Sequence, residues 1–197
     1  MFIARRAALV AVPLLISFGL GGCSLLQPQG TGLVLTGAAA CAQGHTWTVD
    51  TKDVATQVFA DLVKRKVAAT KVDNTGTQTM QWATTGEVTV TNDYTLTVTT
   101  TPAAGQTLVA TRVHKGTATG KAYVDSDVAI PRNWNATAAS VTTKFALNGA
   151  EVPAPAPFAI AATDLDDSVG IEITCSGTAM TTHARGSVIT QKWTRSG

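Results

Sequence analysis

Charge is scarce in this sequence. Only 14% of its 197 residues are Asp, Glu, Lys or Arg. Two of the 15 basic residues, Arg5 and Arg6, lie within the first 22 positions, which leaves 13 basic against 13 acidic residues in the remainder. A neutral domain without clustered Lys and Arg lacks the basic surface that nucleic-acid binding requires. We therefore expect no nucleic-acid partner.

Sequence motifs for catalysis and for cofactor binding are also missing. There is no Gly-x-Ser-x-Gly elbow and no dinucleotide-binding fingerprint. The segment 116–121 has the Gly and Lys of a phosphate-binding loop but not the full spacing, and we expect no helix after it. The sequence therefore favours a non-enzymatic protein, and an enzyme acting on envelope material is the least favoured of three hypotheses.

Metal ligands are scattered along the chain. His45, His114 and His183 never stand at ligand spacing. The acidic cluster at 164–167 lacks the alternating oxygen ligands and the terminal carboxylate of a calcium loop, which favours a solvated turn. We expect neither a metal nor another cofactor.

Thr, Ala, Val and Gly take the place of the missing charges. Alternating Val and Thr favour strands that have one apolar face and one hydroxyl-bearing face. A chain of 197 residues is long enough for one domain with a substantial core. Composition therefore predicts a single, mainly β domain.

The first 23 residues have the layout of an export signal. A basic start, Met1–Arg6, precedes the mostly apolar run Ala7–Leu20, which is too short for a stable membrane span. The ending Leu20-Gly21-Gly22-Cys23 resembles the bacterial lipobox. The resemblance implies cleavage before Cys23 and lipidation of its thiol, with acyl chains such as palmitate. The alternative is an ordinary secretory signal that happens to contain a cysteine.

The lipobox resemblance divides the chain into three parts. Residues 1–22 are the lipoprotein signal peptide, 23–40 a lipidated flexible tether with Gly and Pro, and 41–197 the single mainly β domain. Two or three acyl chains anchor a protein stably. We therefore expect a lipid anchor on Cys23 that holds the domain at the extracytoplasmic face of the cell membrane.

The two remaining cysteines are Cys41 and Cys175. Export exposes them to an oxidising environment, where two distant thiols pair readily, and we expect a disulfide between them. The alternative, a catalytic or metal-binding thiol, lacks support because neither cysteine belongs to a ligand-spaced cluster.

The only helix that we expect follows the first strand of the domain. Residues 45–49 alternate as a strand, and Asp50 then has the position of an N-cap for a helix over 51–67. The basic run 64–66 suits the end of that helix, either as a solvated terminus or as a membrane-facing patch. One apolar stripe is expected, made of Val54, Val58, Phe59, Leu62 and Val63.

The rest of the domain has the two-residue period of strands. We expect turns at Asn92-Asp93, between Gly116 and Gly120, and at Asn148-Gly149, and a loop over 130–135. The proline-containing segment 151–158 suits an edge or a crossing over the surface, and three strands from Ile171 form a terminal meander. Eight or nine strands with one helix near the start predict a curved antiparallel sheet or a lipocalin-like half barrel.

Tryptophans are the remaining candidates for a site. Trp47, Trp82 and Trp193 have strand-like neighbours, and at least two of them are expected to fill the core or to plug the base of the barrel. Trp134, in the expected loop beside Arg132, is the candidate for contact with a partner.

Two short patterns carry a further resemblance. Gly44–Trp47 near the start, together with Cys175–Gly177 and Trp193–Arg195 at the end, is similar to small actinobacterial envelope lipoproteins whose β-domains are lipocalin-like. The helix after the first strand departs from a simple lipocalin. The favoured hypothesis, which rests on the expected anchor and on the missing catalytic motifs, is a lipocalin-like domain that binds an apolar molecule or lipid. The alternative is a protein-interaction module of the envelope without a cavity.

Overall fold

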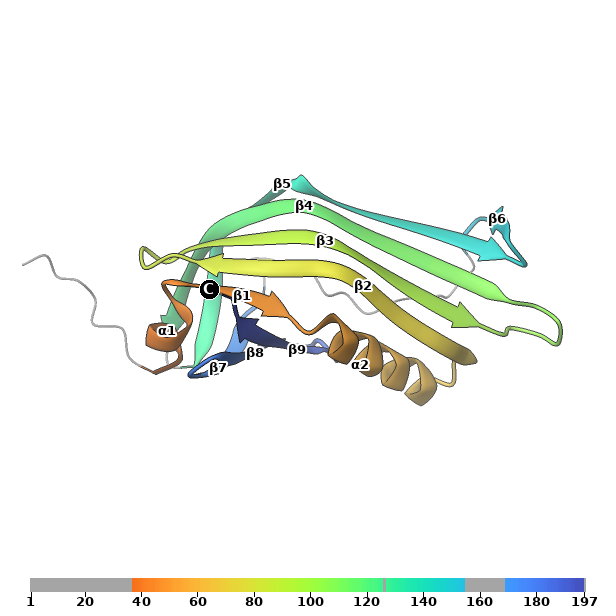
Figure 1. Ribbon diagram of the computed structural model, residues 1–197, viewed down its shortest axis with the longest axis horizontal. Coiled ribbons are helices and arrows are strands. Elements are labelled where there is room, and N and C mark those ends of the chain that lie inside the picture. Colours follow the sequence, from red (N-terminus) through yellow and green to blue (C-terminus); the bar gives the residue numbers. More distant parts are fainter. Residues whose placement is uncertain (1–36, 126, 155–168, 197) are drawn as a thin grey trace, which may run out of the picture. The chain divides into compact units, whose positions relative to one another are not determined.

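The computed structural model describes residues 37–125, 127–154 and 169–196 (Figure 1). They belong to one compact unit, Leu35–Gly197. The predictions for Cys23, for the tether before residue 37 and for the acidic cluster at 164–167 lie outside the described residues. The elements are α1 (Gly37–Ala42), β1 (His45–Val49), α2 (Thr51–Lys64), β2 (Ala69–Trp82), β3 (Glu87–Thr100), β4 (Leu108–Asp125), β5 (Val128–Leu147), β6 (Ala150–Val152), β7 (Ile171–Ser176), β8 (Ala179–Ala184) and β9 (Thr190–Arg195).

Eight of these nine strands close an antiparallel up-and-down barrel. Each strand pairs with the next in the order β1, β2, β3, β4, β5, β7, β8 and β9, and β9 pairs with β1. The ninth, β6, pairs with the far end of β5 after the Asn148-Gly149 turn. The predicted fold class, a mainly β domain with a curved antiparallel sheet, is confirmed, and so is the terminal meander of β7, β8 and β9.

The barrel closes at one end only, because its strands differ greatly in length. β1 and β7–β9 have five or six residues, whereas β2–β5 have 14 to 20. Within the described part of the chain, β5 pairs with β7 through Val128 and Ala129 alone. Beyond the short strands, β2–β5 continue together as a curved four-stranded sheet, with α2 along β2 (Figure 1). Neither described helix is long and apolar enough to cross a bilayer.

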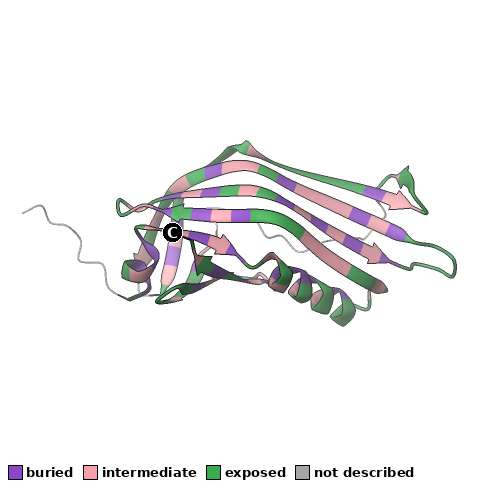
Figure 2. Cartoon of the chain, viewed as in Figure 1, coloured by how far each residue is buried: buried purple, intermediate pink, exposed green. Residues whose placement is uncertain are grey.

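Alternation along the strands places the core. In β3 the residues Val88, Val90, Leu96 and Val98 are buried, and the threonines between them are not (Figure 2). Burying each such side chain contributes roughly 1.5–3 kcal/mol. The expectation that at least two of Trp47, Trp82 and Trp193 fill the core is confirmed, and all three do, because each exposes at most 2% of its surface.

Helix α2 begins where the sequence predicts. The Asp50 carboxylate accepts hydrogen bonds from the backbone N–H groups of Lys52 and Asp53, both at 3.0 Å, as an N-cap does. The buried stripe is narrower than expected, because Phe59 and Val63 are 37% and 52% exposed. Each follows a buried residue by one position, a turn of about 100° around the helix, which carries it away from the sheet.

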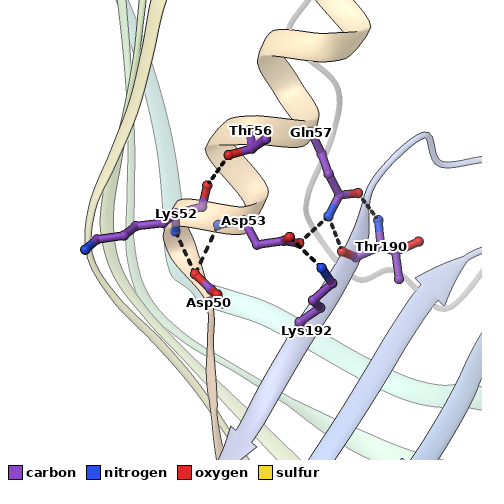
Figure 3. A network of polar contacts seen from close by, with 7 residues as sticks. All are labelled: Asp50, Lys52, Asp53, Thr56, Gln57, Thr190 and Lys192. Carbon is purple, nitrogen blue, oxygen red and sulfur yellow. Dashed lines mark hydrogen bonds and ion pairs between the residues drawn. The ribbon is translucent and has the colours of Figure 1, made fainter.

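A polar clamp joins α2 to β9 (Figure 3). The Gln57 amide donates to Thr190 O at 2.6 Å and accepts from Thr190 N at 2.8 Å. Asp53 holds both Gln57 Nε2, at 2.6 Å, and Lys192 Nζ, at 2.7 Å. The hydrogen bond and the negative charge of Asp53 raise the pKa of Lys192. The bonds to Thr190 and Lys192 connect residues more than 130 positions apart and hold the start of α2 beside the last strand.

The predicted disulfide between Cys41 and Cys175 is confirmed, with their Cα atoms 5.8 Å apart. It ties α1 to β7. Helix α1 itself was not expected: the predicted tether extends to Ala40, whereas the helix begins at Gly37. Alanine favours helix, but six residues are too few for a helix that is stable alone, and burial of Ala38, Ala39 and Ala42 supplies the missing stability.

The predicted turn at Asn92-Asp93 is wrong. β3 continues through both residues, and the chain instead turns at 83–86. Asn92 faces the interior and its Oδ1 accepts a hydrogen bond from Gln78 Nε2 on β2 at 2.8 Å. A polar pair across two strands thus keeps a turn-forming residue in extended structure.

The predicted turn between Gly116 and Gly120 is wrong as well. β4 runs through both glycines. Gly116 has φ 91°, and a Cβ there would collide with the carbonyl oxygen of Ala138 on β5. These glycines therefore permit a close approach of β5 rather than a reversal of the chain.

Candidate functional site

The predicted loop over 130–135 is a bulged part of strand β5. The pairing with β4 shifts register twice, between Thr117 and Thr119 and between Thr119 and Lys121, and Asn133 has φ 53°. A bulge bends a strand and redirects its side chains. Here Trp134 packs against the core, and its ring lies over Gly120. The sequence shows no periodicity at 130–135 because the bulge interrupts it.

An interior polar chain crosses the barrel from β9 to β3. It begins at Trp193, whose Nε1 donates to Thr182 Oγ1 at 2.9 Å, and Thr182 Oγ1 in turn donates to Gln191 Oε1 at 3.4 Å. Gln191 Nε2 then donates to Gln78 Oε1 at 2.9 Å. The final bond runs from Gln78 Nε2 to Asn92 Oδ1, so five side chains form one connected series.

The polar groups of this chain are deeply placed. Gln78, Thr182 and Gln191 are only 4%, 5% and 6% exposed. A buried amide without partners costs about 1–3 kcal/mol, and a connected network removes that cost. The chain therefore delivers a polar group, the Asn92 side chain, to the inward row of β3 between Val90 and Tyr94.

A cavity of about 240 Å³, here called the inner cavity, lies at the end of the polar chain. It lies along the inner side of β3–β5, and its mouth is formed by exposed residues of β5, Ala136, Ser140 and Val141. Its lining residues are Gln78, Val90, Asn92, His114, Ala118, Trp134, Ala136, Ala139, Ser140 and Val141.

An aromatic pair stands beside this cavity. The rings of His114 and Tyr94 are stacked, with centroids 4.4 Å apart and planes at 10°. His114 is 1% exposed and is paired with Val141 across β4 and β5. The imidazole is therefore fixed by stacking at the wall of the inner cavity.

Trp134 lines a second, smaller cavity of about 30 Å³ inside the closed end of the barrel. That cavity is bounded chiefly by apolar residues, among them Trp82, Ile171 and Ile173. Because one indole ring lines both spaces, the position of Trp134 sets the boundary of the inner cavity. Its predicted contact with a partner stays a prediction, now placed at a cavity wall rather than on a surface loop.

The three histidines stand on three different strands. His45 meets the edge of Trp47, and His183 Nδ1 lies 3.2 Å from Thr190 Oγ1. Over 37–125, 127–154 and 169–196, no three His, Cys, Asp or Glu side chains are grouped to hold a metal ion.

The sequence does not predict that the residues of the polar chain are connected. Their signal is present in β3, where Asn92 takes an inward position between Val90 and Tyr94 in an otherwise apolar row. Its partner Gln78 and the next member of the chain, Gln191, lie 113 positions apart, and no local pattern joins them.

Comparison with protein-family models, with characterised proteins and with solved structures finds no match to this chain. No role can therefore be transferred from a relative. Function has to be inferred from the cavity, its lining and the polar chain.

Proposed function

We propose that this protein is a membrane-anchored extracytoplasmic lipoprotein, not an enzyme, whose barrel binds a small and largely apolar molecule in the inner cavity. The supporting observation is the cavity of about 240 Å³ with its mixed lining. Val90, Ala118, Trp134 and Val141 supply apolar surface, and a few fixed polar groups stand among them. Ligand sites commonly combine these two features.

The volume limits the size of the ligand. Pockets for drug-sized molecules measure roughly 300–1,000 Å³, whereas an apolar cavity of about 150 Å³ holds benzene. A cavity of about 240 Å³ suits a molecule slightly larger than benzene, or one end of a longer chain whose remainder leaves through the mouth.

The proposed localisation rests on Leu20–Cys23, which resembles a lipobox. A disulfide between Cys41 and Cys175 agrees with export, because such bonds persist in oxidising compartments. Lipid on Cys23 would hold the barrel at the outer side of the membrane.

Native mass spectrometry tests the binding proposal. The protein is exported with Cys23→Ser and with a cleavable secretory signal peptide in place of residues 1–22. The product lacks both the thiol that would carry lipid and the apolar leader, so no detergent is needed. We expect a bound small molecule in the wild-type barrel and its loss in Ala136→Trp, since a new indole at Ala136 would occupy the cavity.

Ala138→Trp is the matched control. Ala138 is also exposed on β5 but does not line the cavity. A bare mass for the wild type, or equal loss of the ligand in both variants, contradicts the proposal and favours a protein-interaction module. Acylation of Cys23 is checked separately, by mass spectrometry of the N-terminal peptide of the unmodified protein.

A further inference from the structure

We infer that the ligand of the inner cavity carries a neutral hydrogen-bond acceptor, of the carbonyl type found in ketones, esters and amides, and that Asn92 Nδ2 donates to it. This inference rests on the proposed function, because it concerns the ligand of the same cavity. It follows from the direction of the interior polar chain.

The direction is set at Trp193. An indole N–H is a donor only, so Thr182 Oγ1, at 2.9 Å, must accept. The hydroxyl proton of Thr182 is then available for Gln191, and it meets Gln191 Oε1 along the longest bond of the series, 3.4 Å. With its oxygen facing Thr182, Gln191 turns its NH₂ group towards β2.

The same orientation passes through the two remaining amides. Gln191 Nε2 donates to Gln78 Oε1 at 2.9 Å, so the NH₂ group of Gln78 faces onward. That group donates to Asn92 Oδ1 at 2.8 Å. Each amide therefore uses its oxygen on the side nearer Trp193 and its nitrogen on the side nearer the cavity.

The series ends on a donor. Among the residues that the structure describes, the only side-chain hydrogen bond of Asn92 is the one that Oδ1 accepts from Gln78. Its Nδ2 group belongs to a residue that lines the inner cavity. A partly buried N–H group gains about 0.5–1.5 kcal/mol from an acceptor, so the site favours a ligand that supplies one.

The lining favours an uncharged acceptor. None of the described lining residues is Lys, Arg, Asp or Glu. Arg112, the next inward residue of β4 beyond His114, is not part of the lining. A carboxylate or phosphate moved into such a cavity would lose its hydration without a Lys or Arg in the lining to pair with, which is costly.

Two probes of similar shape test the inference. Acetophenone carries a carbonyl acceptor, and ethylbenzene has a methylene in its place. Dissociation constants are measured by ¹H–¹⁵N NMR titration of the exported Cys23→Ser protein and of its Asn92→Asp and Asn92→Leu variants. Asp keeps an oxygen for Gln78 but removes the donor, and Leu removes both without adding charge.

We expect both Asn92 variants to raise the dissociation constant of acetophenone about five- to tenfold, as the loss of one hydrogen bond implies. The dissociation constant of ethylbenzene should change less than twofold. In the wild type, the side-chain NH₂ signals of Asn92 should shift with acetophenone and stay in place with ethylbenzene. This second measurement decides the question even if a variant fails to fold.

Two failures can be told apart. If both probes bind the wild type but the Asn92 variants weaken them equally or not at all, the inferred acceptor is wrong and the proposed cavity function stands. If neither probe saturates the wild type at millimolar concentration, the inner cavity does not take ligands of this class, and the proposed function fails with the inference.

Discussion

The indole ring of Trp134 lies directly over the backbone of Gly120, across the pairing of β5 with β4. A Cβ added at Gly120 would overlap Cε3 of the ring. Gly120 has no left-handed φ, so an alanine there meets the ring without backbone strain of its own. The absence of one side chain on β4 thus makes room for the ring that bounds the inner cavity.

Gly120→Ala should lower the free energy of unfolding by about 1–3 kcal/mol, because overpacking forces the ring or the strand to shift. Urea unfolding of the exported Cys23→Ser protein measures the change. Trp134→Ala supplies the control background, in which Gly120→Ala should lower the free energy of unfolding much less. Equal costs in the two backgrounds would contradict the assigned contact.

Gln78→Leu should lower the free energy of unfolding by about 1–3 kcal/mol, because it leaves Gln191 Nε2 and Asn92 Oδ1 without their partner. Adding Gln191→Leu should cost less than the sum of the two single changes, since the second removes one orphaned group. Urea unfolding of the two single variants and the double variant gives this coupling. Strict additivity would show that the chain is not a connected unit.

Replacing Cys41 and Cys175 together by Ser should lower the free energy of unfolding by about 5 kcal/mol in the chain-entropy model. The loop that the bond closes is long, with a sequence separation of 134. Guanidinium unfolding of the oxidised protein and of the double variant measures the loss. Reduced wild-type protein should match the double variant, and a difference of under about 1 kcal/mol between oxidised and reduced protein would contradict this prediction.

Lys192→Met should remove a pH-dependent part of the stability. The pKa of Lys192 is raised in the folded protein above its ordinary value of 10.5, by the hydrogen bond and the charge of Asp53. The unfolded state therefore loses this proton first, so the contribution is complete below about pH 10 and declines as pH rises through the folded pKa.

The measurement compares the urea midpoints of wild type and Lys192→Met between about pH 7 and pH 11.5. The urea midpoint of the wild type should exceed that of the variant up to about pH 10, and the two midpoints should converge above it. A difference that grows with alkaline pH, or is absent at neutral pH, would contradict the role of the ion pair. Lys71→Met is the control, because the ion pair of Lys71 with Asp73 lies within β2 and does not join α2 to β9.

Where hydrophobic period and local capping agree, sequence and structure coincide. The strand His45–Val49, the N-cap at Asp50 and the alternation over 171–175 are all readable from neighbouring residues. These features depend on contacts within a few positions, which local chemistry determines.

The misassigned segments have one cause in common. Asn92, Gly116, Gly120 and the stretch 130–135 resemble turns or loops by residue type, yet they lie within long strands. In each case a neighbouring strand supplies the reason: a hydrogen bond from Gln78, a close carbonyl of β5, or the ring of Trp134. Tertiary pairing outweighs the local preference of a single residue.

The sequence by itself determined the mainly β class, the capped helix, the inward rows of the strands and the pair Cys41–Cys175, because period, capping and the count of thiols are local or compositional properties. Only the tertiary structure decided that the barrel closes, that Trp134 turns inward, and that Gln191 and Gln78 meet to deliver Asn92 to a cavity. Those features depend on the register between strands far apart in the chain, and the two-residue period of a strand does not encode which strand lies beside it.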